Sequence, residues 1–573
     1  MMTNDGFRIN RPGTAIRPAR TVAAAEILAL FLGALLVLFA VQNRTGAWER
    51  EFGFHPDESA HYVTGVMVSE YIRDGAPTSP LRFAEQYYIR YPRLAIGHWP
   101  PLFPATLGGW FLLFGPGRGS VFTLMALLGA ATATLLYLLV RRGASAWLAA
   151  GAVVWWILFQ APTQILTSSV MTEVPLTLCC LAAVLAYISY LERPGLGSAL
   201  LFGLAAAAAL LIKGLGIVLA FLPPLGVLAC GRLSLLKRWD FWLPAGVVLL
   251  LAGPWYLLQG SLIPTAFGSP MHRLTLTRLV DSSERAGFVV NLLGPAATIV
   301  AALALAAVFL GPALRGRCSP MVAVIGAYAV ASLFLHVALP ESAEPRHLFH
   351  LTPVFIAVVA LAAGALAERL PAWTAPPARF ALALLALGRL AWPHDWPQKP
   401  DFALIDLAER LAADHSLDGS VFLVSSNGTA EGAFIAEAAR LAPDPRWFVL
   451  RATKSLAWVN WRGGGYYEPY FETAESLEEY LESQPVAVLV LERGQFEDLA
   501  HDALLRGAIE EHPERWRRIA EASSSNQPFQ VFAYRSTAPD VRPRGPIRVD
   551  MSRRLGHALE ASPNPSLREL AQP

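Results

Sequence analysis

Residues 55–62 have the sequence His-Pro-Asp-Glu-Ser-Ala-His-Tyr and hold the densest group of side chains that could do chemistry. Proline is favoured at the start of a helix, and acidic side chains are favoured there by the helix dipole. On a helix that begins at Pro56, Asp57 and Glu58 precede His61 by four and three residues, so we expect all three side chains to share one face. The alternative is an ordinary helix N-terminus with solvated charges.

These side chains are suited to acid–base chemistry beside a bound anion. A carboxylate at a boundary between membrane and water could deprotonate a hydroxyl or an amine. Cationic side chains would hold a phosphate group before and after it leaves. The aromatic ring of Trp99 could stack on a sugar, and an interfacial aromatic belt is the alternative role. Further candidates for the site are scattered along the chain: Tyr62, Arg90, Arg93, His98, Glu173, Lys213, Arg346 and His347.

The composition indicates a membrane domain followed by a water-soluble domain. The 573 residues are 54% hydrophobic and 16% charged, with a mean hydropathy of +0.41, whereas soluble domains have roughly 25% charged residues. Apolar runs fill residues 22–392, and charge is dense after 395. The net charge is only +2 and there is no basic run or nucleic-acid motif, which argues against a nucleic-acid partner. The four cysteines have neither disulfide nor metal-ligand spacing.

Arginine positions predict the orientation of the apolar segments. Clustered arginines in residues 1–21 place the N-terminus in the cytoplasm. We expect 22–42 to be the first span rather than a cleaved signal peptide, because the run is long, lacks a convincing cleavage site and is followed by many more apolar runs. Residues 43–118 then form a long external loop. Arg141 and Arg142 belong in the cytoplasm, so residues 119–140 run inward, and the short apolar piece 100–114 lies in the interface instead of crossing.

The remaining apolar runs continue this alternation to give about 11 spans, with an external C-terminus. They are residues 146–166, 174–191, 198–212, 215–230, 240–258, 287–311, 319–339, 348–367 and 380–392. This topology brings Glu173, Lys213 and Arg346 to the outer membrane face, together with the first loop. Ionisable residues at membrane depth are costly and usually functional, although each alone could be a snorkelling residue at a helix end.

Residues 395–537 have the pattern of a small α/β domain. Strands are expected over 420–425, 447–450, 486–491 and 529–534, and helices over 402–414, 430–441, 472–483 and 495–511. Such alternation is typical of a partly parallel sheet. The tail, residues 538–573, is rich in proline, arginine and serine and is expected to be disordered.

Taken in order, the motifs resemble those of the C-type superfamily of membrane glycosyltransferases, particularly bacterial relatives of protein O-mannosyltransferases and of lipid A aminoarabinose transferases. The segments that carry the resemblance are Pro56-Asp57-Glu58 with His61-Tyr62, His98-Trp99-Pro100-Pro101-Leu102, Thr172-Glu173-Val174-Pro175-Leu176, Ile212-Lys213-Gly214 and Glu344-Pro345-Arg346-His347. The resemblance covers about residues 20–392 and implies a polytopic α-helical glycosyltransferase domain, here followed by the soluble α/β domain.

The resemblance implies an inverting transfer from a polyprenyl-phosphate sugar to a lipid, glycan or protein acceptor, at the outer face of the inner (plasma) membrane. It makes Asp57 the general base and Glu58 a second catalytic carboxylate. The family's second-loop acid is commonly Asp where this chain has Glu173, and its late Arg-Tyr pair is here Arg346-His347, so the donor sugar stays open. We expect no required cofactor and no metal ligand, although a divalent metal held by the acids and histidines of these loops is the alternative.

The rival interpretation is a transporter or lipid flippase. Transporters commonly have paired repeats and broken helices at the bilayer midplane, whereas the sequence shows no repeat and gathers its polar groups at one surface. A structural anchor for the external domain would not explain acids and bases on the outer face.

Overall fold

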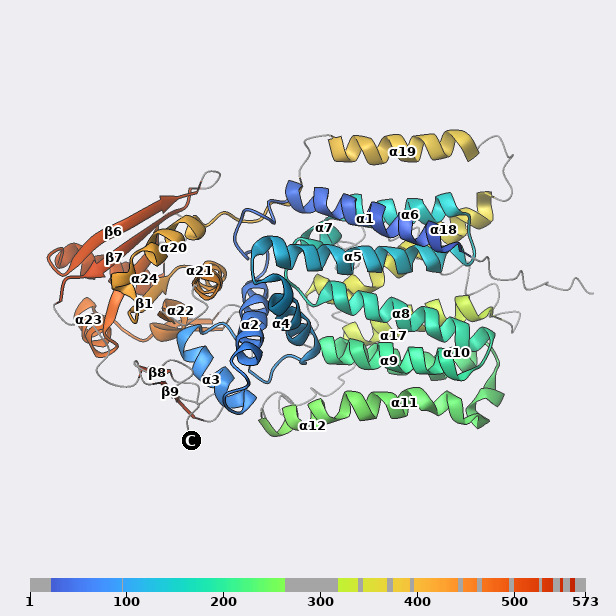
Figure 1. The fold of residues 1–573 in the computed structure, drawn as a ribbon, viewed down its shortest axis with the longest axis horizontal. Coiled ribbons are helices and arrows are strands. Elements are labelled where there is room, and N and C mark those ends of the chain that lie inside the picture. The colour runs from blue at the N-terminus through green and yellow to red at the C-terminus, as the bar shows by residue number, and fades with distance from the viewer. Residues whose placement is uncertain are drawn as a thin grey trace, which may run out of the picture.

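The computed structural model describes most of the membrane helices and the α/β domain (Figure 1). Within residues 22–561 it describes 22–94, 96–262, 318–338, 344–367, 375–391, 396–441, 447–460, 466–493, 499–524, 528–538, 547–549 and 557–561. The expected N-terminal segment 1–21 and the expected span 287–311 lie outside these residues.

Long apolar helices run side by side and form the membrane domain (Figure 1). By length and composition, five helical segments among the described residues could cross a membrane. They are α1 (Ala24–Arg44), α5 (Arg118–Arg141), α8 (Glu173–Glu192), the pair α11 (Trp239–Leu251) and α12 (Gly253–Leu262), and η3 (Pro345–Leu351) continued by α18 (Thr352–Ala367).

Other apolar helices are shorter than the sequence suggested. The expected span 146–166 is broken into α6 (Ala146–Leu158) and α7 (Ala161–Thr167), which are bent by 70° because Pro162 starts a new helix. The count of about 11 spans therefore stays a prediction. The other apolar segments are α4 (Leu102–Phe114), α9 (Leu196–Ile212), η1 (Gly214–Phe221), α10 (Leu222–Ala229), α17 (Pro320–Ala338) and α19 (Ala375–Ala391), with η2 (Leu233–Lys237) between α10 and α11.

The first loop forms a layer between the membrane helices and the α/β domain. It contains α2 (Pro56–Arg73) and α3 (Pro80–Arg90), and in Figure 1 α2 and α4 run across the direction of the long helices. Gly65 in α2 and Gly108 in α4 allow these two helices to pack closely. A Cβ on Gly65, for example, would lie 2.6 Å from the Leu107 Cβ. The interfacial position expected of residues 100–114 stays a prediction.

The C-terminal domain is built on a mixed five-stranded sheet in the order β2-β1-β5-β7-β6. Strands β2, β1 and β5 are parallel, and β7 and β6 are antiparallel to their neighbours, so the four expected strands and the partly parallel sheet are confirmed. The sheet strands are β1 (Val421–Ser425), β2 (Phe448–Arg451), β5 (Val486–Arg493), β6 (Trp516–Ser523) and β7 (Gln530–Ser536). Strand β6 was not expected, because its arginines and glutamate mark an exposed edge and hide the β-strand pattern.

Helices cover this sheet near the expected positions. They are α20 (Leu404–Ala413), η5 (His415–Leu417), α21 (Gly428–Leu441), α22 (Ala452–Ser455), α23 (Ala474–Ser483) and α24 (Ala500–Glu511), with a small hairpin of β3 (Ala457–Asn460) and β4 (Tyr466–Pro469). The expectation of a disordered tail is wrong for two short segments, β8 (Ile547–Val549) and β9 (Leu559–Ala561). They pair antiparallel, contact α3 and bury Ile547 and Leu559.

Helix α21 packs directly on α2 and joins the α/β domain to the first loop. The contact is close at Gly432, where a Cβ would lie 2.5 Å from the Ser59 Oγ. Farther along α21, the buried Glu437 carboxylate pairs with Arg118 at the start of α5. The α/β domain thus packs, through α21, against α2, the helix that carries Asp57.

Candidate active site

The first turn of α2 is formed as its sequence predicts. His55 is the N-cap, and its Nδ1 accepts a hydrogen bond of 3.0 Å from the Asp57 backbone N–H. Pro56 occupies the first helical position, where its missing N–H costs nothing. This cap leaves the Asp57 side chain free to project from the helix start, and 38% of that side chain is exposed.

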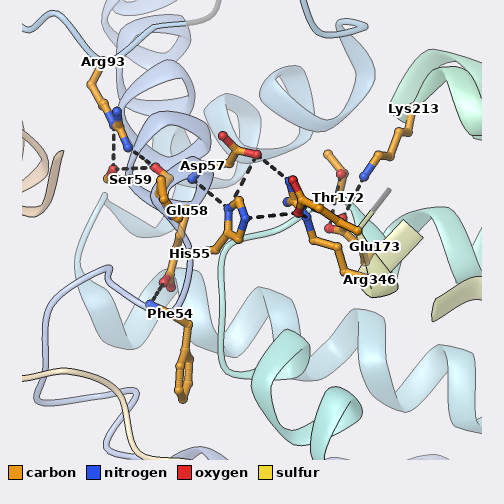
Figure 2. Close-up of polar contacts among 12 residues, drawn as sticks. Phe54, His55, Asp57, Glu58, Ser59, Arg93, Thr172, Glu173, Lys213 and Arg346 are labelled. Carbon is orange, nitrogen blue, oxygen red and sulfur yellow. Dashed lines mark hydrogen bonds and ion pairs between the residues drawn. The ribbon is translucent and has the colours of Figure 1, made fainter. Parts of the chain in front are cut away.

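Asp57 contacts the guanidinium of Arg346, which lies 289 residues later in the sequence. The Arg346 Nη2 donates to the Asp57 Oδ2 at 2.9 Å, and the His55 Nδ1 lies 3.5 Å from the same oxygen (Figure 2). Burial alone would raise the pKa of Asp57, but His55 and Arg346 outweigh it and lower the pKa below its usual value. Asp57 is therefore an ionised carboxylate at neutral pH, the form that a general base requires.

Glu173 lies on the other side of the same guanidinium. Its Oε1 is 3.6 Å from the Arg346 Nη1 and accepts a hydrogen bond of 2.7 Å from the Lys213 Nζ. The exposed Glu344 pairs with the Arg346 Nε and lies 3.4 Å from the His55 Nε2. Three carboxylates and two permanent cations thus form one network (Figure 2).

Helix ends bring these side chains together. Glu173 is the first residue of α8, where the helix dipole favours an acid, and Lys213 directly follows α9, where it favours a cation. Lys213 has an extended backbone, and the chain then turns back closely: a Cβ on Gly216 would lie 2.6 Å from the backbone of Ala209. Arg346 is the second residue of η3 and reaches the network from the start of that helix. The expected convergence of Asp57, Glu173, Lys213 and Arg346 is thus what the structure shows.

Glu58 does not share a face with Asp57, contrary to expectation. Adjacent helical residues point about 100° apart, and the Glu58 carboxylate turns toward the Phe54 N–H (Figure 2). It is fully buried and lies 2.5 Å from the Nζ of Lys399, also fully buried. No sequence pattern indicates this partner, which lies 341 residues away. Both side chains are fully buried, so the structure does not bring the Glu58 carboxylate to the exposed side of the site beside Asp57.

The aromatic candidates divide into two groups. His61 is buried and stacked on Trp99 with ring centroids 3.8 Å apart, and burial lowers the pKa of His61 to about 3, so its ring is neutral. Trp99 is half-buried beside the exposed His98. Tyr62, in contrast, is fully buried, stacks on Phe52 and donates its hydroxyl to the Pro116 carbonyl, which places it in the core.

Two further candidate cations have different placements. Arg90 is buried with its guanidinium 4.7 Å from the centre of the Phe448 ring, so it joins α3 to the α/β domain and not to the Asp57 network. His347 follows Arg346 in η3, and its Nδ1 is buried without a hydrogen-bond partner among the described residues. His55 and Glu344 join the network although neither was singled out as a site residue; both flank residues that were.

The acids of this network pair with cationic side chains in the structure. Arg346 and Lys213 already neutralise Asp57 and Glu173 at the positions where a cation would bind. No group of three or more His, Cys, Asp or Glu side chains suited to a metal occurs in the described part of the chain.

Comparisons with known proteins concern the fold and one segment of the chain. Residues 98–257 match the family model of dolichyl-phosphate-mannose-protein mannosyltransferases. The fold is similar to that of ArnT from Cupriavidus metallidurans bound to undecaprenyl phosphate, with a TM-score of 0.53 and 16% identity over 90% of this chain and 99% of that one. It is also similar to the oligosaccharyltransferase AglB from Archaeoglobus fulgidus in complex with an inhibitory peptide and a dolichol-phosphate, with a TM-score of 0.51 and 14% identity over 94% and 76% of the two chains.

A comparison with curated protein sequences found no match. The fold and the matched segment nevertheless confirm the resemblance to C-type membrane glycosyltransferases and the expected fold class. The chain thus has the fold of membrane glycosyltransferases and contains a segment that matches a mannosyltransferase family.

Proposed function

We propose that the protein is an inverting glycosyltransferase that moves a sugar from a polyprenyl phosphate to an acceptor at the outer face of the cytoplasmic membrane. The observation that carries this proposal is the single guanidinium of Arg346 placed between Asp57 and Glu173, with Lys213 on the far side of Glu173. A base and two phosphate-binding cations thus lie within one network. The undecaprenyl phosphate and dolichol-phosphate in the ArnT and AglB structures support a polyprenyl-phosphate donor.

Arg346 and Lys213 are the groups that we assign to the donor phosphate. Guanidinium binds phosphate and carboxylate with the same forked geometry, so an arriving phosphate can replace the carboxylates on Arg346. That exchange would release Asp57 from one of the cations that hold its pKa down, and its pKa would rise. Donor binding would in this way make Asp57 a stronger base at the moment when the acceptor needs one.

The transfer itself is then a single displacement. The acceptor hydroxyl gives its proton to the Asp57 carboxylate while its oxygen bonds to the anomeric carbon. The bond between that carbon and the phosphate oxygen breaks, and its electron pair leaves with the polyprenyl phosphate, whose charge Arg346 and Lys213 stabilise. Attack opposite the leaving phosphate inverts the anomeric configuration.

Trp99 provides an aromatic surface for the sugar, and the His61 ring stacks on the Trp99 ring. His98 and His347 stay proposed substrate-binding residues at the edges of this region. The acceptor is a hydroxyl or amine on a lipid, a glycan or a protein, and the exposure of Asp57 leaves it room to approach.

The test is a transfer assay with the purified chain in nanodiscs and a polyprenyl-phosphate sugar. Asp57→Asn keeps the size of the side chain but removes proton acceptance, so we expect a loss of roughly 10²–10⁴ in rate. Asp406→Asn, at an exposed position of α20, is the matched control and should transfer at the wild-type rate. Near wild-type transfer by a folded Asp57→Asn variant would remove Asp57 as the base.

A further inference from the structure

A buried lysine that does not belong to the membrane helices, Lys399, contacts Glu58, the residue next to Asp57. Lys399 is in the segment between α19 and α20, and its side chain is fully buried. The ammonium lies 5.0–5.6 Å from the ring centres of Phe52, Phe54 and Phe122 and donates to the Glu51 carbonyl at 3.2 Å. Among the described residues, the carboxylate paired with this ammonium is that of Glu58, at 2.5 Å.

Glu58 connects three segments that are far apart in the sequence. Its Oε2 accepts from the Phe54 N–H at 3.1 Å, just before α2. Its Oε1 accepts both from Lys399 and from the Val170 N–H at 3.2 Å. Val170 lies three residues before Glu173, and Glu58 is adjacent to Asp57. One carboxylate therefore joins the base to the segment that presents the other acid of the network.

The backbone around Lys399 is attached to the first loop as well. The Lys399 N–H donates to the Thr45 carbonyl at 2.9 Å, and its carbonyl accepts from the Arg50 Nη1 at 2.7 Å. Glu51 accepts from the Phe402 N–H at 3.1 Å and the Leu404 N–H at 2.8 Å, where α20 begins. The ammonium is thus delivered to Glu58 by a segment whose own position is fixed.

We infer that Lys399, acting through Glu58, is a positioning residue that sets the spacing of Asp57 and Glu173 across Arg346. The inference rests on the proposed function for its catalytic consequence. A buried ion pair is a weak source of stability, because desolvation of both charges offsets their attraction. It is an effective way of fixing geometry, because each carboxylate lone pair is directed at a definite donor. Small displacements of reacting groups can lower rates by about 10²-fold.

Two variants separate positioning from stability. Lys399→Met leaves the Glu58 charge buried without its partner and should lower both the melting temperature and the turnover number. The double variant Glu58→Gln with Lys399→Met removes both charges, so the melting temperature should recover. A glutamine offers a single acceptor oxygen, so the Phe54 and Val170 N–H groups cannot both stay bonded as they are. We therefore expect kcat of the double variant to stay roughly 10–100-fold below wild type with little change in donor KM.

Amide hydrogen exchange gives a readout that does not depend on activity. Peptides covering residues 50–58 and 166–173 should exchange faster in the double variant than in wild type, in the full-length chain in nanodiscs. Lys454→Met, at an exposed lysine of the α/β domain, is the control and should alter none of these measurements.

Each outcome decides the inference. Recovery of kcat together with the melting temperature, or unchanged exchange in both peptides, would show that the pair only fills space and would overturn it. Absence of any transfer by the wild-type chain would instead contradict the proposed function, while the exchange of the two peptides would still decide whether Lys399 and Glu58 hold the segments together.

Discussion

The Asp57 carboxylate and the Arg346 guanidinium are joined by a hydrogen bond of 2.9 Å, although 289 residues separate them in the sequence. The contact connects the proposed base to the proposed phosphate-binding group, so neither can change without affecting the other. It also explains how Asp57 stays ionised while half-buried. The conservative replacement of Arg346 is therefore more informative than its removal.

Arg346→Lys should weaken donor use strongly. A lysine keeps the charge but cannot contact Asp57, Glu173 and a phosphate in the forked arrangement of a guanidinium. Each lost hydrogen bond to a charged group is worth about 1.5–3 kcal/mol, so we expect donor KM to rise roughly tenfold or more. Steady-state kinetics with varied donor would measure this. Arg142→Lys, at a partly exposed ion pair with Glu192, is the control. A wild-type donor KM in Arg346→Lys would make the residue an ordinary helix-end anchor.

The topology predicted from the sequence identifies the residues of the Asp57 network but not the packing partners that hold them in place. Arginine positions and span lengths predict that Glu173, Lys213 and Arg346 lie on the same side of the membrane, because helix ends are set by the local sequence. The roles expected of Tyr62 and Arg90 depended on which way a side chain points from its element. That direction depends on packing partners that the local pattern does not identify: Phe52 for Tyr62, and for Arg90 the distant Phe448.

The separation of Glu58 from Asp57 shows the same limit more sharply. On a helix, adjacent residues do not face each other, so a neighbouring pair of acids is poor evidence for a paired site. The direction of the Glu58 carboxylate follows from its partners Phe54, Val170 and Lys399, and the last two are distant in the sequence. The lysine is flanked by prolines in a segment without helical or strand periodicity, and no local pattern marks it.

Gly432→Ala should impair the contact between α21 and α2. The new methyl group would lie 2.5 Å from the Ser59 Oγ and 2.6 Å from the Arg93 Nε. These two groups are hydrogen-bonded at 3.0 Å, and Arg93 also donates to the Pro56 carbonyl at the start of α2. Overpacking costs typically 1–3 kcal/mol, against a gain of about 1 kcal/mol in helix propensity, so we expect a lower melting temperature and slower transfer.

The matched control for Gly432→Ala is Gly507→Ala in α24, where a Cβ would meet nothing within 4 Å. Propensity alone should raise the melting temperature there. Thermal unfolding of both variants, followed by the transfer assay, makes the comparison. Equal stabilisation by both alanines would mean that α2 and α21 are not in close contact at Gly432.

Single cysteines can test the predicted orientation in the membrane. Ser79 in the first loop and Ser523 in β6 are exposed, and both are predicted to lie outside the cytoplasm. Cysteines there should react with an impermeant thiol reagent in intact spheroplasts. Gly197, exposed at the opposite end of α9 from Lys213, has room for a side chain and should react only after lysis. The reverse pattern would put the site on the cytoplasmic side.

The α/β domain should lose stability as the pH rises toward neutrality, because of Asp502. This residue is buried at the start of α24 and bonded to the Ser425 hydroxyl, and burial raises the pKa of Asp502 to about 7 from 3.8. Since its folded pKa lies above the unfolded value, its stabilising contribution is complete below about pH 4 and is lost as the pH rises through about 7.

Asp502→Asn removes this titration while keeping a hydrogen-bond acceptor for Ser425. The variant should therefore melt close to wild type at pH 4 and above wild type at pH 8, where the wild-type carboxylate is ionised in a buried position. Asp406→Asn, at an exposed aspartate of the same domain, should keep the wild-type difference between the two pH values. Melting curves of the three proteins at both pH values would measure the effect. A wild-type pH dependence in Asp502→Asn would show that Asp502 stays ionised in the folded domain throughout this range.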